Sequence, residues 1–334
     1  VERRRLRRHE GCPRRHRRLT TEVNDTMSTT STLADPLSAG RPDVPFLKAK
    51  KRPVETAIRW SLLLAALVSI GITIGIIVSL VRPVIDFFAE VSVGTFLSTD
   101  HEFGVLPLIG GTLMTTAIAL CVAVPIGLGA AMYLSEYASA RARKFLKPTV
   151  ELLAGVPSVV YGFFALTFVT PVLLQRVLKL EVNFTNVLAA GLVLGVMIIP
   201  TIASLAEDAL SAVPLALRQG SLAMGANRMQ TTLRVVFPAA LSGIAAAIVL
   251  GLSRAIGETM IVALAAGAQK NLSLDPREGM QTMTGFIAMT TGGENPVGST
   301  SYNNLFAVGL SLFVLTLVVN LISIRIVRRY RQEY

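Results

Sequence analysis

Five long stretches of this sequence are apolar and contain no charged residue, and they limit the possible fold more than any other feature. Because a helix needs about 20 apolar residues to cross the hydrocarbon core of a bilayer, each stretch is long enough to span a membrane or nearly so. A sixth stretch is interrupted only by Arg254 and Glu258. The sequence therefore predicts an all-α integral membrane protein with six transmembrane helices. The six stretches are Ser61–Val81, Gly110–Leu134, Leu152–Leu174, Val187–Leu205, Pro238–Ala268 and Leu305–Ile324.

Much of the net charge of +11 lies in an N-terminal tail. Residues 1–26 hold nine Arg against three Glu and one Asp, and they lack the apolar core of a signal peptide. We expect residues 1–56 to be a disordered basic cytoplasmic tail, with Met27 as the true start of translation. Residues 57–334 are then the transmembrane domain. Nucleic-acid binding by the tail is the alternative, and we expect no nucleic-acid partner.

The Lys and Arg residues beside the apolar stretches predict the orientation of the chain, because cytoplasmic connections carry an excess of these residues. With a cytoplasmic N-terminus, the inner connections and the C-terminal tail hold eleven basic residues and the outer connections five. Both termini are therefore expected in the cytoplasm.

The third stretch contains helix-breaking residues, with one Pro and two Gly in Gly155–Gly162. Proline removes a backbone donor, and exposed backbone in a bilayer is tolerated only against protein or a water-lined cavity. Broken transporter helices often present N–H groups and hydroxyls to an anion. We therefore place Ser158 and Tyr161 on a substrate path. Thr201, in the fourth stretch, follows a proline that makes a milder helix interruption, and we place it on the same path. A simple proline kink is the alternative.

Arg254 and Glu258 are four residues apart, which predicts that they lie one turn apart on one face of a helix. A charge at the centre of a span costs about 2.5–3.5 kcal/mol on insertion scales, and facing partners reduce that cost. The guanidinium can also offer a bidentate fork to phosphate or sulfate. A polar transport path is our interpretation, and a purely structural ion pair is the alternative.

The connection 207–238 is a cytoplasmic loop with a specific spacing. Gln219-Gly220-Ser221 is followed by three residues, Leu-Ala-Met, and then by Gly225. After nine further residues the loop ends with Val-Val-Phe-Pro238. This resembles the Glu-Ala-Ala loop of ABC-importer permeases, in which a coupling helix docks on the ATPase. Gln, Gly and Ser replace Glu, Ala and Ala here. Gly225 suits a left-handed cap between two short amphipathic helices with exposed Leu217, Leu222 and Met224. The residues assigned to ATPase coupling are Arg218, Gln219, Gly220, Ser221, Gly225 and Pro238.

Further stretches resemble the PstC-type permease subunits of prokaryotic phosphate ABC importers. They are Val150–Leu166, Glu207-Asp208 with Val213-Pro214, and Arg254–Met260. The resemblance covers roughly residues 51–334. It implies a permease of the plasma membrane that carries phosphate, with Arg254, Glu258 and Thr259 lining the path. It also implies three partners, namely a PstA-type second permease, a cytoplasmic ATPase dimer and an extracytoplasmic phosphate-binding protein. A PstA-type chain, or a permease for sulfate or molybdate, is the alternative.

The energy for transport is expected to come from a partner, because the sequence has no Gly-x-x-x-x-Gly-Lys-Ser/Thr loop to hold ATP phosphates. We expect no enzyme activity in this chain, no cofactor and no metal site. Cys12 lies in the tail and Cys121 in a span, so no disulfide is expected. A gradient-driven secondary transporter is the rival from another class, but it would usually show an internal two-half repeat.

Overall fold

The computed structural model describes residues 53–100, 102–293 and 295–329, and within these ranges the chain forms helices and connections but no strand. The all-α prediction is confirmed for these residues. The predicted tail lies outside them, except that residues 53–56 form the first turn of α1 (Pro53–Glu90). The chain divides into two compact units, Val1–Ala66 and Leu67–Tyr334. In the first unit the described residues are the opening turns of α1, and all other helices belong to the second unit.

α1 is apolar on all sides, as expected of a membrane span. Within the second unit, every residue from 67 to 79 is exposed. A Cβ added at Gly71 or Gly75 would have no heavy atom within 4 Å. Only the last turns of α1 are buried, through Val84 and Phe87.

α3 (Leu106–Met132) and α6 (Val187–Ser211) pack along much of their length. Glycines in α6 permit this close approach. A Cβ at Gly191 would lie 2.8 Å from the Cβ of Ile118, and one at Gly195 would lie 2.9 Å from the carbonyl oxygen of Ala119. The α3–α6 pair is therefore a rigid support for the helices around it.

α10 (Leu241–Ile256) packs against α6 and against α13 (Thr300–Arg329). A bend of 71° separates α10 from the preceding helical segment, Arg228–Ala239. Within the described residues, five helices are long and apolar enough to cross a membrane, and the number is six if the bent pair is one span. This agrees with the predicted six spans.

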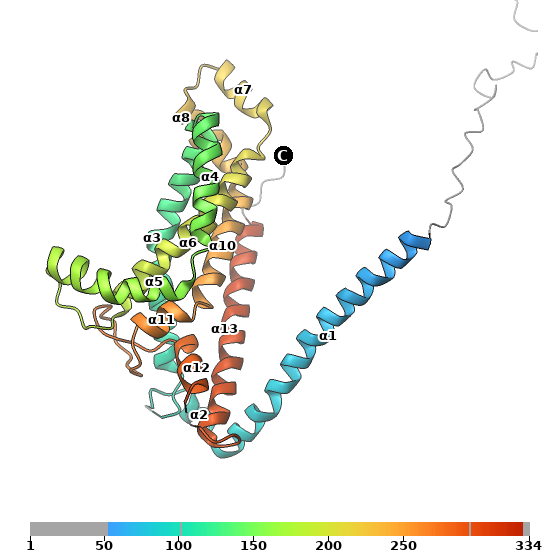
Figure 1. The fold of residues 1–334 in the computed structure, drawn as a ribbon. Helices are drawn as coiled ribbons and strands as arrows, with labels where there is room; N and C mark the ends of the chain where they lie inside the picture. Colours follow the sequence, from blue (N-terminus) through green and yellow to red (C-terminus); the bar gives the residue numbers. More distant parts are fainter. Residues whose placement is uncertain (1–52, 101, 294, 330–334) are drawn as a thin grey trace, which may run out of the picture. The chain divides into compact units, whose positions relative to one another are not determined.

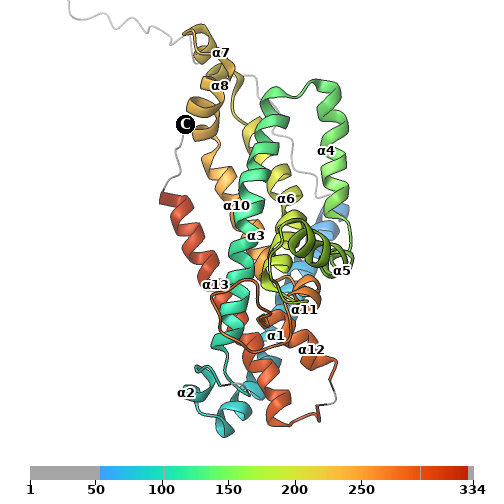
Figure 2. The same cartoon turned by 90° about the vertical axis from the view of Figure 1, so that its left-hand side faces the viewer.

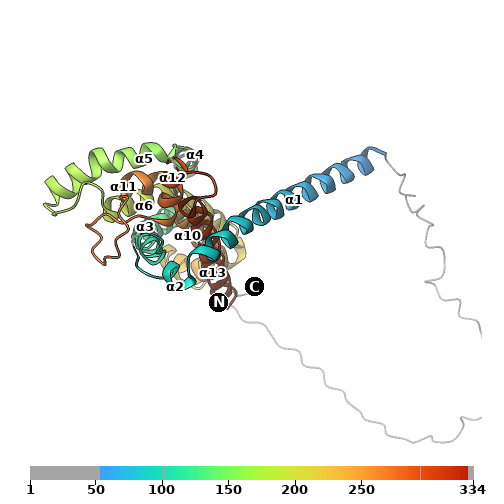
Figure 3. The same ribbon diagram turned by 90° about the horizontal axis from the view of Figure 1, so that it is seen from below.

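The third stretch has different bounds from those predicted. α4 (Ala140–Ala154) ends before Gly155, and α5 (Ser158–Phe164) begins after Pro157 and continues as the π-helix η2 (Ala165–Val177). The candidate span is therefore Ser158–Val177 and not Leu152–Leu174. Figures 1 and 2 show that α5 and η2 run across the direction of α3, whereas α4 lies along α6. Seen from below, α5 lies at the periphery of the second unit (Figure 3).

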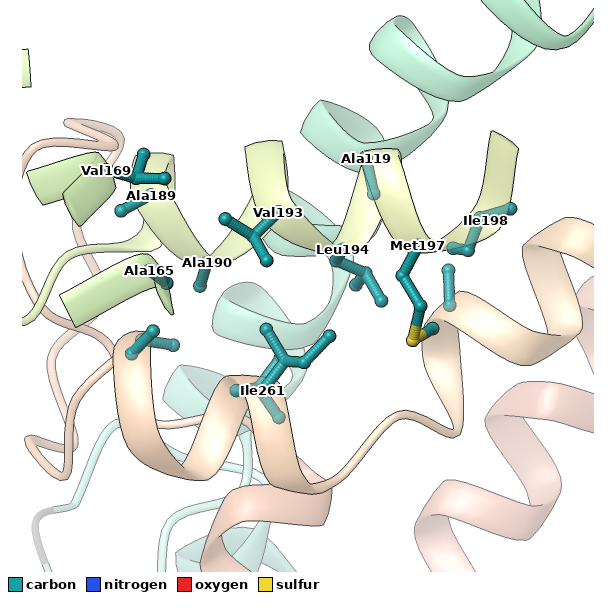
Figure 4. Close-up of a cluster of buried hydrophobic side chains, with 14 of the residues drawn as sticks. Ala119, Ala165, Val169, Ala189, Ala190, Val193, Leu194, Met197, Ile198 and Ile261 are labelled. Atoms are coloured by element: carbon teal, nitrogen blue, oxygen red, sulfur yellow. The ribbon is translucent and has the colours of Figure 1, made fainter. Parts of the chain in front are cut away.

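Three clusters of buried apolar side chains hold these helices together. The largest joins α3, η2, α6 and α10 to α11 (Met260–Ala265), and Figure 4 shows Leu194 and Met197 of α6 on the side facing Ile261 of α11. A second cluster centres on Phe87, whose ring meets that of Phe96 edge-on at 5.6 Å. The third cluster includes Leu210 and Val236.

The second unit has two ends, which are formed by different connections between the helices. At one end α2 (Val93–Phe96) lies near the last turn of α1 and the start of α13, where Thr300 donates a hydrogen bond to Glu90. At the other end lie the turn between α3 and α4 and the segment that follows α6 (Figures 1 and 2). The candidate coupling loop is at this second end.

Candidate functional site

The predicted coupling loop folds as two short helices, as expected. α6 extends to Ser211, and α7 (Leu215–Ala223) and α8 (Arg228–Thr231) follow. The π-helix η3 (Thr232–Val236) and α9 (Phe237–Ala239) lead from α8 to the bend before α10. Pro238 lies in α9, directly before the bend, where its missing N–H has the least effect on the helix.

The turn between α7 and α8 is fixed by two capping motifs. Gly225 has a φ of +86°, as predicted for a left-handed cap. Its N–H donates to Leu222 at 3.0 Å and the next N–H, from Ala226, donates to Ser221 at 3.2 Å, which is the Schellman pattern. α8 then begins with a capping box between Asn227 and Gln230. The turn is therefore rigid, and only glycine adopts its central conformation without strain.

The outer side of the loop carries apolar side chains that the chain does not cover. Met224 is 89% exposed, Leu215 66%, Met229 62% and Leu222 46%. Exposed apolar patches of this kind mark contact surfaces. Leu217, predicted to be exposed, is instead partly buried against Leu210 and its neighbours. The predicted residues Gln219 and Gly220 are exposed on α7, whereas the hydroxyl of Ser221 lies 2.9 Å from that of Thr231 and joins α7 to α8.

Arg218 fastens α7 to the rest of the chain. Its Nη2 donates to the carbonyl of Leu210 at 2.7 Å and lies 3.1 Å from Oε1 of Glu136, in the π-helix η1 (Tyr133–Tyr137) between α3 and α4. Both side chains are more than four-fifths buried. Arg218 thus positions α7 from its buried side, and exposed residues such as Leu222 and Met224 form the surface that a partner can reach.

A second ionic cluster joins α4 to α6, and the sequence analysis did not predict it. Glu207 is only 2% exposed and accepts hydrogen bonds from Arg143, from Lys147 at 2.6 Å and from Ser211 at 2.8 Å. Lys147 also pairs with Asp208 at 2.6 Å. The hydrogen bonds that Lys147 donates to Asp208 and to Glu207, with the bond to Asp208 as the larger cause, raise the pKa of Lys147. The sequence signal for this cluster was the spacing of Arg143 and Lys147, two basic residues four apart in an amphipathic helix.

Arg254 and Glu258 do not form the predicted pair on one helix face. α10 ends at Ile256, so Gly257, Glu258 and Thr259 form a break before α11. Glu258 Oε1 accepts the backbone N–H of Met260 at 3.2 Å, and no ion pair joins it to Arg254 among the described residues. Gly257 is the C-cap residue of α10, and its N–H donates to the carbonyl of Ser253 at 3.2 Å. Arg254 is exposed one turn before the break.

Threonines outside the predicted set hold this break in place. Thr284, in α12 (Met283–Thr291), donates its hydroxyl to the carbonyl of Glu258 at 2.6 Å. Thr112 of α3 accepts the backbone N–H of Met283 at 2.9 Å. α12 therefore bridges α3 and the break, and it occupies part of a connection that the sequence analysis left as an outer loop.

The helices that follow the two breaks, α5 and α11, pack on each other. A Cβ at Gly162 would lie 3.2 Å from the carbonyl oxygen of Met260. Ser158 begins α5, and the Tyr161 hydroxyl donates across the break to Leu153 at 3.1 Å. Tyr161 also packs against the buried apolar cluster that includes Ile261 of α11. That Ser158, Tyr161, Glu258 and Thr259 share a substrate path stays a prediction.

Thr201 lies on a different helix from the other predicted path residues. It lies in α6 in line with Ser204 and Asp208, whose side chains meet Glu151 and Lys147 of α4. It therefore shares the α4–α6 face, and no hydrogen bond links it to the other path residues in the described chain. No group of His, Cys, Asp or Glu suited to a metal ion occurs in the described residues.

Comparison with known proteins identifies the family. Residues 123–332 match the model of the binding-protein-dependent transport system inner membrane component. The chain belongs to this permease family. The "Probable ABC transporter permease protein YqgH" of Bacillus subtilis is 37% identical over 76% of this chain and 83% of that protein. The "Phosphate transport system permease protein PstC 1" of Mycobacterium tuberculosis is 39% identical over 68% of this chain and 73% of that protein.

A solved structure supports the fold of this permease family member. The crystal structure of a bacterial ABC transporter that imports the acidic polysaccharide alginate matches with a TM-score of 0.59 and 19% identity, over 84% of this chain and 100% of that one. The resemblance to PstC-type permeases is thus confirmed. The chain is a multi-pass protein of the prokaryotic plasma membrane.

Proposed function

We propose that this chain is the permease subunit of an ATP-driven importer that moves inorganic phosphate across the plasma membrane. The observation that carries the proposal is the α7–α8 loop, which is rigidly capped and presents Leu222, Met224 and Met229 uncovered. Such a surface needs a partner, and the family spacing of the loop gives that partner as an ATPase. The names of relatives such as the phosphate permease PstC 1 of Mycobacterium tuberculosis give phosphate as the substrate.

The power for transport comes from other subunits in this proposal. The sequence holds no loop for ATP phosphates, so a separate cytoplasmic ATPase dimer hydrolyses ATP and pulls on α7 and α8. A PstA-type permease forms the other half of the path. An extracytoplasmic phosphate-binding protein delivers the substrate at the opposite end.

The substrate path runs past the two helix breaks. Glu258 caps the backbone of α11 through Met260, so the guanidinium of Arg254 has no carboxylate partner among the described residues. An unpaired Arg in a span is costly unless an anion or a second subunit meets it. Its planar fork matches two phosphate oxygens, and the hydroxyls of Ser158 and Thr259 lie near the breaks as further donors.

The test is uptake of labelled phosphate into proteoliposomes that hold the assembled importer with ATP and binding protein. Arg254→Gln is expected to lower the uptake rate at least tenfold while the subunits still co-purify, because the bidentate contact to phosphate is lost. Arg176→Gln, which removes a cation from the end of η2, is the matched control and should leave uptake unchanged.

Three outcomes would contradict the proposal. Uptake without ATP would favour a gradient-driven transporter. Saturable uptake of sulfate or molybdate with no uptake of phosphate would change the substrate. Normal phosphate uptake by Arg254→Gln would remove Arg254 from the path.

A further inference from the structure

α4 has two faces with different roles. Arg143 and Lys147 lie on the face that is ion-paired with Glu207 of α6. The other face carries residues at spacings of three, four, seven and eleven from Arg141, which place them on one side of a helix. These residues, named here the α4 outer face, are Arg141, Lys144, Phe145, Pro148 and Leu152.

The α4 outer face is uncovered and has unpaired charge. Phe145 is 72% exposed and Leu152 76%. Neither Arg141 nor Lys144 makes an ion pair among the described residues. A recess of about 600 Å³ reaches this face at Lys144 and Pro148, and its lining also includes Arg143, Lys147 and Glu151 of α4. The two cations of this face are therefore without an ion-pair partner in the described part of the chain, and its apolar side chains are uncovered.

The order of residues along this face matches the order of groups in a lipid leaflet. Its cations come at the start of α4, at the end of the unit where the coupling loop lies (Figure 2). Phe145, Pro148 and Leu152 follow over the next two turns of α4, farther from the coupling-loop end. Cations at the headgroup level with apolar residues below them are typical of binding to anionic lipid surfaces.

We propose that the α4 outer face binds an anionic phospholipid of the leaflet on the coupling-loop side. Arg141 and Lys144 hold the headgroup phosphate, and one acyl chain lies along Phe145, Pro148 and Leu152. A soluble ATPase would meet the cations but not Leu152, which lies near the other end of α4. The lipid would hold α4 against α6 from outside, while Glu207 holds it from inside.

The experiment measures phosphatidylglycerol that stays bound to the purified importer, by native mass spectrometry and by titration in nanodiscs. The double variant R141Q/K144Q is expected to weaken binding by roughly tenfold or more, given the attraction of each cation to an anionic surface. R176Q/K179Q removes two cations from the other side of the chain and is the control, with unchanged binding. A second variant, F145Q/L152Q, tests the acyl contact without a change of charge and should also lower lipid retention.

Equal retention of phosphatidylglycerol by R141Q/K144Q and its control would overturn the proposal. So would loss of the ATPase or of the second permease from R141Q/K144Q at unchanged lipid content, because the face would then be a protein interface. Size-exclusion profiles and thermal unfolding of each variant verify that it is folded. Lipid binding is tested independently of the transported substrate, so this result does not depend on phosphate uptake.

Discussion

Glu207 is the one charged side chain among the described residues that is more than nine-tenths buried, and its burial links two parts of the permease. Its carboxylate bridges Arg143 and Lys147 of α4. α4 leads directly to the break at Gly155, and α6 leads to the coupling loop. A buried carboxylate is costly unless it is paired, so the α4 cations are needed for the fold.

Replacing Glu207 with Gln is expected to lower the free energy of unfolding by about 1–3 kcal/mol, because two cations lose their buried partner. Thermal unfolding of the detergent-solubilised protein measures this loss. Asp208→Asn is the matched control, since Asp208 is 59% exposed in its side chain and Lys147 keeps Glu207 as a partner. Equal destabilisation by the two substitutions would show that burial of Glu207 has no special effect.

At the residue scale, the sequence indicated where charges lie but not how they pair. The spacing of Arg254 and Glu258 suggested a pair only on the assumption of a continuous helix, and Gly257 between them was the signal that this assumption was wrong. Glu207 was noticed only through its resemblance to relatives. Its partners in α4 are about sixty residues away in the chain, and no local pattern gives such a contact.

At the scale of elements, helix breaks position the candidate site. The break after α4 and the break after α10 are both at Gly residues, and the sequence signalled the first through Gly155 and Pro157. The coupling loop was predicted well, because its capping residues are local: Gly225 ends α7, and Asn227 with Gln230 begins α8. The crossing of α5 over α11 at Gly162 was not predictable, because it depends on a contact between distant segments.

Gly225 and Gly220 form a matched pair for a test of the coupling loop. A Cβ at either position would have no heavy atom within 4 Å, but only Gly225 has a positive φ, of +86°. Gly225→Val is therefore expected to strain the turn by about 1–3 kcal/mol and to uncouple ATP hydrolysis from uptake. Gly220→Ala adds a methyl group on the same coupling helix without backbone strain, so it should change the coupling less than Gly225→Val does. The measurement is the number of ATP molecules hydrolysed per phosphate imported. An unchanged ratio in Gly225→Val would contradict the assignment of this loop to coupling.

At the scale of the whole molecule, the number of spans was predictable and the direction of each helix was not. Apolar length indicates five spans, and six if the bent pair counts as one span, because the bilayer sets a minimum length. The crosswise course of α5 and η2 in Figure 1 depends on packing against α11, which composition does not encode. The orientation in the membrane follows from the basic residues, and it remains a prediction that chemical labelling can test.

Cysteine labelling in intact cells tests the predicted orientation. In a background with Cys12 and Cys121 replaced by Ser, a single cysteine is placed at Thr99 or Val297, on connections next to α2 and α13, or at Ala140, at the start of α4. All three positions are exposed. A membrane-impermeant maleimide is expected to label Thr99→Cys and Val297→Cys directly.

The same reagent should label Ala140→Cys only after the membrane is permeabilised. The reason is that the α3–α4 turn carries Arg141, Arg143 and Lys144, which favour the cytoplasmic side, and that Arg218 ties this end to the coupling loop through Glu136. The background protein without cysteines controls for nonspecific labelling. If Ala140→Cys reacts from outside while Thr99→Cys and Val297→Cys are protected, the coupling loop faces away from the cytoplasm. No cytoplasmic ATPase could then reach Met224, and the importer proposed here could not draw on ATP through this loop.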